Sequence, residues 1–360
     1  MSLIKLKSSM TVIANSIIYL VFLLLFTDFV AGFALDLYRK NQRGATDFTL
    51  LDPKAMAELG EVQGEADLNL YRWYSNKPNY RGSHVQTDQS GFRIDAEALT
   101  NDETIGMFGG STVFSVITSQ NGTIPNILSS LLDGKQVLNF GVGGYSSGAE
   151  IMTFVEAARA YPRMQTAIFY DGVNELGRAA ERQGENRILN SYELIGAPYI
   201  SGEIAAISKS APGLSVADSN LYFIFKRIVQ KLLVSDNPGN HSDYLDRIVD
   251  RYFENLKVLS GICGVYNIDC IFTWQPSIFT APHDALTSRE LLIREQTPMS
   301  DYTLLTQKIF EDSRAQKYKV KNISSALDAK SNEHQYYYDW CHLSSDGNRL
   351  VAEALAKTLE

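Results

Sequence analysis

Asp339 lies three residues before His342, in the run 339–342 (DWCH) near the end of the 360-residue chain. A carboxylate at this distance can hold a histidine imidazole in one tautomer. The serine that this base would activate is Ser111, which follows two glycines at the end of an apolar run. A serine hydroxyl is a poor nucleophile until a neighbouring base accepts its proton. These three residues predict acyl-transfer chemistry, most simply that of an esterase.

Acyl transfer also needs hydrogen-bond donors aimed at the oxyanion that forms on the substrate. The backbone N–H of Ser111 is one candidate. Gly144 is a second, because a glycine lets its backbone approach a substrate without a side chain in between. The side-chain amide of Asn174 is a third. Each of these residues follows a different predicted strand, so we expect Ser111, Gly144 and Asn174 to form an oxyanion hole.

Short apolar segments alternate with helical patterns from about residue 100 onward. Strands are predicted at 104–108, 136–140, 166–171 and 268–274, with a weaker one at 318–323. Helices are predicted near 124–133, 149–160, 242–262, 287–316 and from about 346 to the end. This alternation predicts a three-layer α/β/α fold with a mostly parallel, flavodoxin-like, five-stranded sheet. Ligand sites of such sheets lie beyond the carboxyl ends of the strands, where Ser111, Gly144 and Asn174 fall.

The N-terminal region differs from the rest. Residues 10–35 are apolar apart from Asp28, which is long enough for a transmembrane helix. We expect residues 1–35 to be an uncleaved membrane anchor; a cleaved signal peptide and a buried helix are the alternatives. Both of the first two interpretations allow export, with the catalytic domain on the extracytoplasmic, periplasmic side of a single-pass protein. Residues 36–100 are interpreted as a membrane-proximal linker and extended lead-in.

The catalytic domain is expected to span residues 101–360, with an inserted helical region at about 176–240. Within the insertion, residues 220–234 are amphipathic and predict a helix that packs over the core or acts as a lid at a membrane surface. The net charge of −8 argues against a nucleic-acid partner. No metal-binding motif or dinucleotide fingerprint is present, so no cofactor is expected.

The chain has three cysteines. Cys263 and Cys270 flank a predicted helix-to-strand turn and could form a disulfide in an exported domain, or stay two separate buried thiols. Cys341, between the expected acid and base, is interpreted as a packing residue because Ser111 already provides the nucleophile.

Four motifs together resemble those of the SGNH hydrolase (GDSL-like) superfamily, which is named after its serine, glycine, asparagine and histidine. The matching segments are 108–112 (FGGST), 139–144 (NFGVGG), 172–175 (GVNE) and 339–342 (DWCH). The resemblance covers roughly residues 100–360. It implies Ser111 as nucleophile, His342 and Asp339 as base and acid, and Gly144 and Asn174 in the oxyanion hole. An α/β-hydrolase is disfavoured, since no Gly-x-Ser-x-Gly elbow surrounds Ser111.

Two departures from the family pattern affect loop geometry and substrate preference more than activity. Gly110 stands where the first motif usually has Asp, and Glu175 stands where the third usually has Asp. The Gly-Gly-Ser-Thr variant, with a lead-in that ends at Gly91-Phe92-Arg93, resembles membrane-linked bacterial members associated with surface polysaccharides. We therefore expect a serine esterase that removes O-acetyl groups from a surface or exported polysaccharide. The alternatives are a lipid esterase, an O-acetyltransferase of the same fold, and a non-catalytic component of a polysaccharide assembly complex.

Overall fold

The computed structural model describes residues 27, 28, 30, 32, 53–64, 74–94, 103–180, 241–297, 299–328 and 333–359. The chain divides into two compact units, and Gly44–Glu185 together with Pro238–Glu360 form the unit that contains the sheet. Met1–Arg43 and Asn186–Asn237 form the other unit. The predicted 220–234 helix, nearly all of the 10–35 apolar segment and most of the predicted insertion lie outside the described residues.

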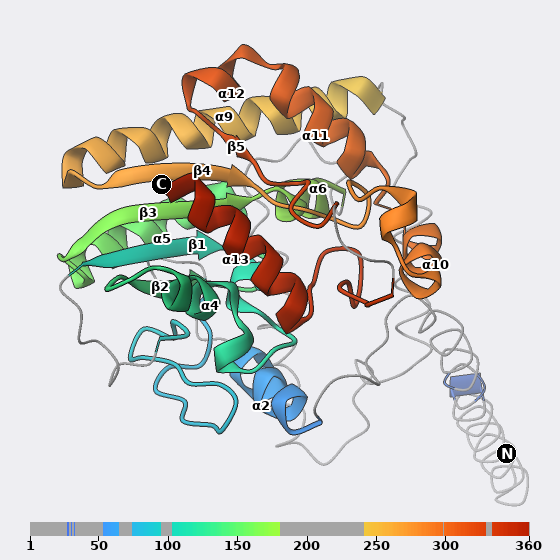
Figure 1. Ribbon diagram of the computed structural model, residues 1–360, viewed down its shortest axis with the longest axis horizontal. Coiled ribbons are helices and arrows are strands. Elements are labelled where there is room, and N and C mark those ends of the chain that lie inside the picture. The colour runs from blue at the N-terminus through green and yellow to red at the C-terminus, as the bar shows by residue number, and fades with distance from the viewer. Residues whose placement is uncertain are drawn as a thin grey trace, which may run out of the picture. The chain divides into compact units, whose positions relative to one another are not determined.

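Five parallel strands form one sheet in the order β2-β1-β3-β4-β5 (Figure 1). They are β1 (Thr104–Gly109), β2 (Gln136–Gly141), β3 (Met164–Asp171), β4 (Asp269–Trp274) and β5 (Lys321–Asn322). This is the flavodoxin-like order, in which the winding direction reverses between β1 and β3. The predicted parallel sheet is confirmed, although β5 is shorter than the segment expected at 318–323.

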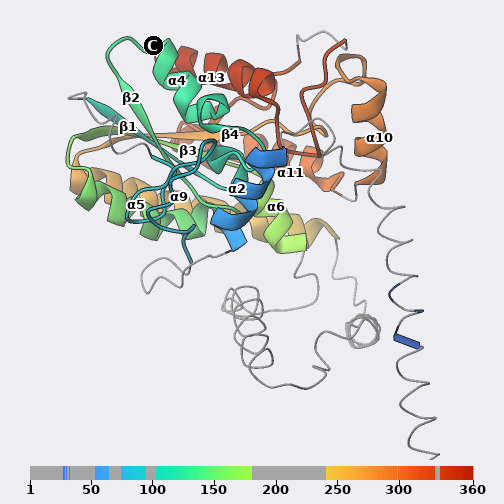
Figure 2. The same ribbon diagram turned by 90° about the horizontal axis from the view of Figure 1, so that it is seen from below.

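Helices cover both faces of the sheet, which confirms the three-layer arrangement (Figure 2). On one face lie α5 (Ser147–Ala160), α6 (Val173–Ala180), α9 (His241–Tyr266) and α11 (Asp301–Glu311). On the other lie α4 (Ile124–Leu131), α10 (Ser288–Gln296) and α13 (Ser345–Leu359). The segment expected as helix at 287–316 is therefore divided among α10, α11 and the short α12 (Ser313–Lys317).

The strands are buried on both faces because their side chains alternate between two apolar cores. Four phenylalanines in register form a stacked row across β2, β1, β3 and β4 on the α9 side. Neighbouring ring centroids in this row are 4.8, 5.1 and 5.3 Å apart, and the residues are Phe140, Phe108, Phe169 and Phe272. On the opposite side, Met107 and Ile168 pack against α4 and α13. This continuous packing fixes the relative positions of the strand ends that carry the candidate site.

The lead-in contains a helix that the sequence interpretation missed, α2 (Pro53–Gly64). Ala55, Leu59 and Val62 are buried at helical spacing, and Leu59 and Val62 pack against Val85 and Phe114. Residues 74–94 form turns and short bridges, such as the antiparallel bridge between Arg81 and Gln86, as the absence of a helical period predicts. The described part of the lead-in thus packs directly on the segment that follows β1.

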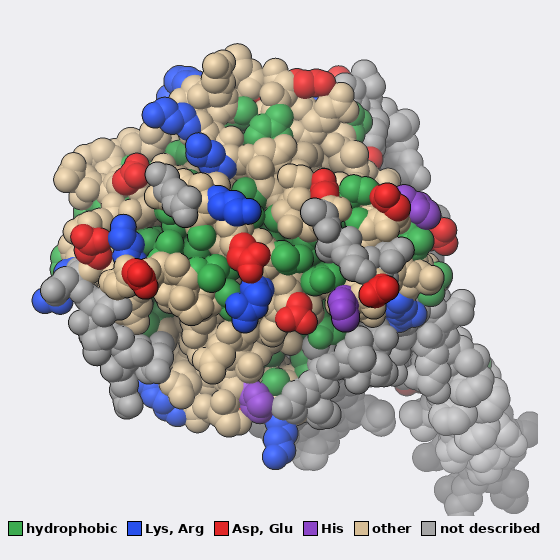
Figure 3. All heavy atoms as spheres, in the orientation of Figure 1, with side chains coloured by type: hydrophobic (Ala, Val, Ile, Leu, Met, Phe, Trp, Pro, Cys, Tyr) green, Lys and Arg blue, Asp and Glu red, His purple; other side chains and the backbone are tan. Residues whose placement is uncertain are grey.

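Cys263 in α9 and Cys270 in β4 form a disulfide, which joins a helix to the strand that follows it. Of the two possibilities left open by the sequence, the structure has the bridged one. Among the described residues, no helix has both the length and the apolar character to cross a membrane. Acidic and basic side chains are interspersed over the face shown in Figure 3.

Candidate active site

Ser111 is the first residue of the short helix α3 (Ser111–Phe114), directly after β1 ends at Gly109. The strand enters this turn through two glycines because there is no room for larger residues. A Cβ on Gly110 would lie 1.8 Å from Asn174 Nδ2, and one on Gly109 would lie 2.4 Å from Val113. The close approach of Asn174 therefore leaves no room for a side chain at position 110 in this structure.

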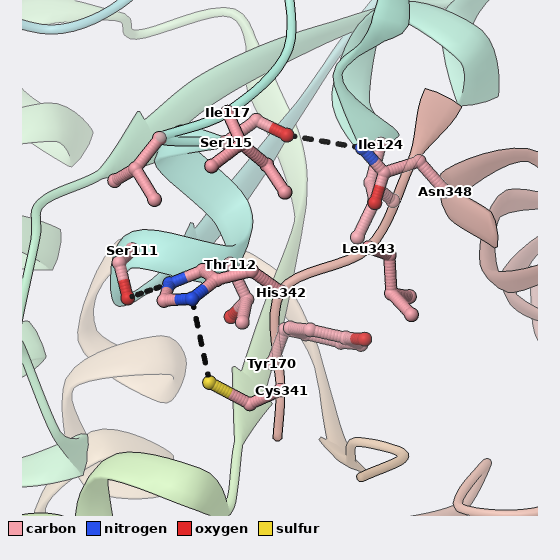
Figure 4. A pocket seen from close by; sticks show the side chains of 11 residues that line it. Ser111, Thr112, Ser115, Ile117, Ile124, Tyr170, Cys341, His342, Leu343 and Asn348 are labelled. Atoms are coloured by element: carbon pink, nitrogen blue, oxygen red, sulfur yellow. Dashed lines mark hydrogen bonds between the residues drawn. The ribbon is translucent and has the colours of Figure 1, made fainter. Parts of the chain in front are cut away.

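The structure brings Ser111 and His342 together although they are 231 positions apart. His342 Nε2 lies 2.8 Å from Ser111 Oγ, and His342 Nδ1 lies 2.6 Å from Asp339 Oδ2 (Figure 4 shows the contact with Ser111). Asp339 Oδ1 also accepts hydrogen bonds from the backbone N–H groups of Cys341 and His342, at 2.9 and 2.8 Å. The expected serine, base and acid thus form one continuous chain of hydrogen bonds.

A fully buried glutamate holds the loop that carries the acid and base. Glu290 Oε2 closes a capping box with Thr287 at the start of α10, while its Oε1 accepts the backbone N–H groups of Tyr336 and Tyr337, both at 2.8 Å. The same loop is bonded to the end of β4 through Trp340, whose carbonyl accepts from the backbone N–H of Ile278 at 3.0 Å. Sequence analysis did not single out Glu290; the Thr-x-x-Glu spacing of its capping box was the available signal.

The electrostatics of the pair favour a charged acid beside a basic imidazole. Burial alone would raise the pKa of Asp339, but the charge of His342 and the hydrogen bonds from His342 and Cys341 hold this pKa at about 2. Burial alone would lower the pKa of His342, but the Asp339 carboxylate raises it above the ordinary value of 6.5. His342 is consequently a stronger base than a free histidine, which suits the removal of a serine proton.

Asn174 lies in the first turn of α6, against Gly110, and Gly144 lies in the loop after β2. Asn174 Nδ2 donates to the backbone carbonyl of Tyr145 at 2.6 Å, which uses one of its two amide hydrogens and fixes the direction of the other. Gly144 has a φ of +75°, a conformation that favours glycine. The bond from Asn174 therefore joins α6 to Tyr145, the residue after Gly144, while Asn174 also lies against Gly110, the residue before Ser111.

Behind these donors lie three buried carboxyl groups on neighbouring elements: Glu150 in α5, Asp171 at the end of β3, and Glu175 in α6. Glu175 Oε1 accepts the backbone N–H of Ser147 at 2.7 Å and so ties α6 to the start of α5, just after Gly144. The carboxyl groups of Glu150 and Asp171 bond to each other and to no other donor among the described residues. Burial, followed by the charges of neighbouring carboxylates, raises the pKa of both groups well above the ordinary values.

A small pocket lies beside Ser111 and His342, on the side of α3 that faces α4 and α13 (Figure 4). Its volume is about 10 Å³, which is room for roughly one water-sized group. Its wall combines apolar side chains, such as Val116, Ile117 and Leu343, with polar ones such as Ser115 and Asn348.

Cys341 is a buried free thiol, as its interpretation as a packing residue requires. Its Sγ lies 3.7 Å from His342 Nδ1 (Figure 4), and burial raises the pKa of the thiol well above its ordinary value. Asp339, Cys341 and His342 form the one group of potential metal-ligating side chains found among the described residues. Because His342 Nδ1 is already bonded to Asp339, the arrangement is that of an acid and base rather than of a metal centre.

Comparisons with known proteins give likeness in fold. No family model matches the chain, and no curated protein matches it. Among solved structures it is similar to a lipolytic protein of the G-D-S-L family from Desulfitobacterium hafniense DCB-2, with 12% identity, 71% of this chain and 98% of that chain covered, and a TM-score of 0.36. It is also similar to an acetyl xylan esterase, at 12% identity, 71% and 100% coverage and a TM-score of 0.37.

A GDSL-like lipase from Bacteroides thetaiotaomicron VPI-5482 is a third similar structure, with 11% identity, 73% and 94% coverage and a TM-score of 0.36. Identities and TM-scores at this level say nothing about the activity of this chain. The distances that join Ser111, His342 and Asp339 do bear on the activity.

Proposed function

We propose that this protein is a serine esterase of the SGNH type that works through an acyl-enzyme. The observation that carries the proposal is the chain of hydrogen bonds from Asp339 through His342 to Ser111, at 2.6 and 2.8 Å. His342 takes the proton from Ser111 Oγ as the oxygen attacks the ester carbonyl, and Asp339 stabilises the resulting imidazolium. His342 then returns the proton to the leaving alcohol, and water hydrolyses the acyl-enzyme.

The negative charge that develops on the carbonyl oxygen is met by three donors. These are the backbone N–H groups of Ser111 and Gly144 and the second amide hydrogen of Asn174. Donors that are already oriented stabilise the transition state without reorganising during the reaction. The hydrogen bond from Asn174 to Tyr145 and the space left by Gly110 support this role, because they hold the amide beside the nucleophile.

The substrate class that we favour is an O-acetylated polysaccharide. The pocket of about 10 Å³ beside Ser111 supports a short acyl group, and acetyl is the commonest short acyl group on carbohydrates. We propose that residues 10–35 anchor the protein to a membrane and that the catalytic unit lies on the extracytoplasmic side. The Cys263–Cys270 disulfide supports such an oxidising location.

The purified full-length chain tests the proposal with a fluorophosphonate probe, which forms a covalent bond with an activated serine. We expect wild type to be labelled with one probe per chain and Ser111→Ala to be unlabelled. A nearby hydroxyl provides the control: Ser130→Ala, on an exposed turn of α4, should be labelled like wild type. A folded wild type that does not react would contradict the esterase and favour the non-catalytic role.

Substrate class is tested with p-nitrophenyl esters of increasing chain length on the same preparation. Acetyl esters should be cleaved with the highest kcat/KM, and a preference for chains beyond about eight carbons would overturn the short-acyl assignment in favour of a lipid esterase. Free acetate as the product of an acetylated polysaccharide indicates hydrolysis. Transfer of the acetyl group to a second sugar would identify an acetyltransferase instead.

A further inference from the structure

Arg93 is the most deeply buried charged side chain of the lead-in, with 1% of its surface exposed. Its guanidinium makes five hydrogen bonds, all to neutral oxygens. Nε donates to Gln120 Oε1 at 3.0 Å, Nη1 to the carbonyls of Phe114 and Ser115 at 2.8 and 2.7 Å, and Nη2 to those of His84 and Thr118 at 3.1 and 2.8 Å. An arginine has five N–H donors, so a single side chain binds all of these acceptors in one fixed geometry.

Four of the five acceptors belong to residues 114–120, at the end of the nucleophile helix and in the turn that follows it. Helix α3 has only four residues, and its C-cap is Ser115, which adopts a left-handed conformation with a φ of 66°. The carbonyl of Ser111 accepts the backbone N–H of Ser115 at 2.8 Å, and the carbonyl of Ser115 accepts from Arg93. Arg93 is therefore two hydrogen bonds away from the backbone of the nucleophile.

The position of Arg93 is itself fixed by the lead-in. The carboxylate of Glu58, in α2, accepts the backbone N–H groups of Ser83, His84 and Val85 at 3.0, 2.7 and 3.1 Å. The carbonyl of His84 in turn accepts from both Arg93 and the backbone N–H of Gln120. A continuous set of hydrogen bonds thus runs from α2 to the turn after Ser111.

Arg93 remains charged in this site. Burial lowers its pKa to about 9, which still leaves the guanidinium protonated at neutral pH. Its charge lies near the C-terminal end of α3, where exposed carbonyls favour a cation, and it also stacks over the Phe114 ring at 5.3 Å. Lysine could keep the charge, but it has three donors on one nitrogen and cannot reproduce the planar fork.

We propose that Arg93 is a positioning residue for Ser111. It holds the turn at 114–120 so that Ser111 Oγ stays in line with His342 Nε2, and it makes the lead-in part of the catalytic unit. This role rests on the proposed serine esterase activity. The alternative is that Arg93 only stabilises the fold. Its replacement would then lower the melting temperature and leave kcat per folded active site unchanged.

The test compares wild type, Arg93→Lys and Leu259→Ala as full-length proteins. Leu259 is buried in the C-terminal part of α9, which leads into the amino end of β4. The site lies at the opposite, carboxyl ends of the strands. Truncation of Leu259 therefore destabilises the fold without touching the nucleophile turn. For each protein, kcat and KM for p-nitrophenyl acetate are measured well below the melting temperature, with active sites counted by fluorophosphonate labelling.

For Arg93→Lys we expect kcat per labelled site to fall about 10–100-fold, because a small misplacement of a reacting group has a large effect on rate. KM should stay within about twofold, since Arg93 does not touch the substrate. Leu259→Ala should keep the wild-type kcat. An Arg93→Lys protein that loses thermal stability like Leu259→Ala but reacts at the wild-type rate per site would overturn the positioning role. Unlabelled wild type would instead contradict the esterase itself.

Gln120→Ala keeps the test decisive if Arg93→Lys does not fold. This variant removes only the acceptor of Arg93 Nε. We expect it to fold and to lower kcat per labelled site about two- to fivefold with little change in KM. A wild-type kcat in the folded Gln120→Ala protein would then count against the proposal.

Discussion

Two sets of carboxyl groups flank the candidate nucleophile, the partly exposed Asp339 and the buried Glu150 and Asp171, and they differ in charge. On the His342 side, Asp339 has a pKa of about 2 and is ionised. On the oxyanion side, burial and mutual repulsion raise the pKa values of Glu150 and Asp171 well above the ordinary range, which favours their protonated forms. The difference follows from the donors that reach each group: Asp339 accepts from His342 Nδ1 and two backbone N–H groups. Glu150 and Asp171 are more deeply buried, and among the described residues their carboxyl groups bond only to each other.

The comparison teaches that burial alone does not decide the charge of a carboxyl group. Hydrogen bonds to the ionised form can outweigh the cost of removing it from water, and their absence leaves burial to dominate. A charged acid is useful beside a base that becomes an imidazolium. Neutral carboxyl groups are more suitable behind an oxyanion hole, because further negative charge there would oppose the charge that develops on the substrate.

The largest expected effect that bears on this comparison is that of Asp339→Asn. The amide cannot stabilise the imidazolium or hold the same tautomer, so we expect kcat/KM to fall by about 10²–10⁴. The pH profile should also change. His342 must be neutral to act as a base, so the wild-type rate rises with pH through a pKa above 6.5. Without the carboxylate, burial lowers this pKa, and the acidic limb of the profile should move to lower pH.

The control for Asp339→Asn is Asp246→Asn, which removes an exposed carboxylate paired with Lys308 at 2.7 Å. This variant should keep both the rate and the profile of wild type. Steady-state kinetics between pH 5 and 9 distinguish the cases. An Asp339→Asn protein whose acidic limb coincides with that of wild type would show that Asp339 does not set the basicity of His342.

An intermediate effect is expected at Glu175, the one carboxyl group of the oxyanion side with a described donor. Glu175→Ala leaves the buried N–H of Ser147 without its acceptor, which costs about 1–3 kcal/mol. Because Ser147 follows the Gly144 loop, we also expect kcat to fall roughly tenfold through misplacement of the oxyanion donors. Glu175→Gln keeps an acceptor oxygen and should retain activity within about threefold. Equal activity in the two variants would mean that the bond to Ser147 does not position the loop.

Sequence patterns predicted those parts of the molecule that depend on local chemistry. The sheet follows from apolar strands such as 104–108 and 166–171, and the meeting of Ser111 with His342 follows from their positions after β1 and before α13. Such residues can be found because parallel strands bring their carboxyl ends to one edge. Glu175 was noticed only as a departure from a motif, without its hydrogen bond to Ser147.

The contacts that the sequence did not predict join segments with no shared periodicity. Nothing around Arg93 indicates that its five acceptors come from residues 84–120, because turns and carbonyl directions leave no pattern in the side chains. The raised pKa values of Glu150 and Asp171 could not be predicted from the sequence for a related reason. Glu150 occupies one turn of an amphipathic helix, and only the packing of α5 against α9 shows that its carboxyl group is buried.

The smallest expected effect concerns stability rather than rate, and it has opposite signs on the two sides of the site. A carboxyl group with a raised pKa contributes stability below its unfolded pKa, and this contribution is lost as the pH rises toward the folded pKa. At high pH the ionised and buried Glu150 carboxylate destabilises the folded state. Glu150→Gln removes this destabilisation while keeping the shape of the side chain. Its melting temperature relative to wild type should therefore increase by roughly 2–4 °C between pH 5 and 9.

Asp339→Asn should behave in the opposite way. A carboxylate with a lowered pKa contributes stability above its unfolded value of 3.8, which is lost as the pH falls toward about 2. The destabilisation by Asp339→Asn should thus be largest between about pH 4 and 6.5, where Asp339 and His342 are both charged, and shrink as the pH falls toward about 2. Three other titratable side chains face the oxyanion-side carboxyl groups: Arg251, Tyr252 and Tyr302. Tyr252→Phe therefore serves as a control that changes polarity without removing a carboxyl group. Thermal melts of all variants between about pH 2 and 9 measure these slopes. Parallel slopes for Glu150→Gln and Asp339→Asn would contradict a difference in charge between the two sides.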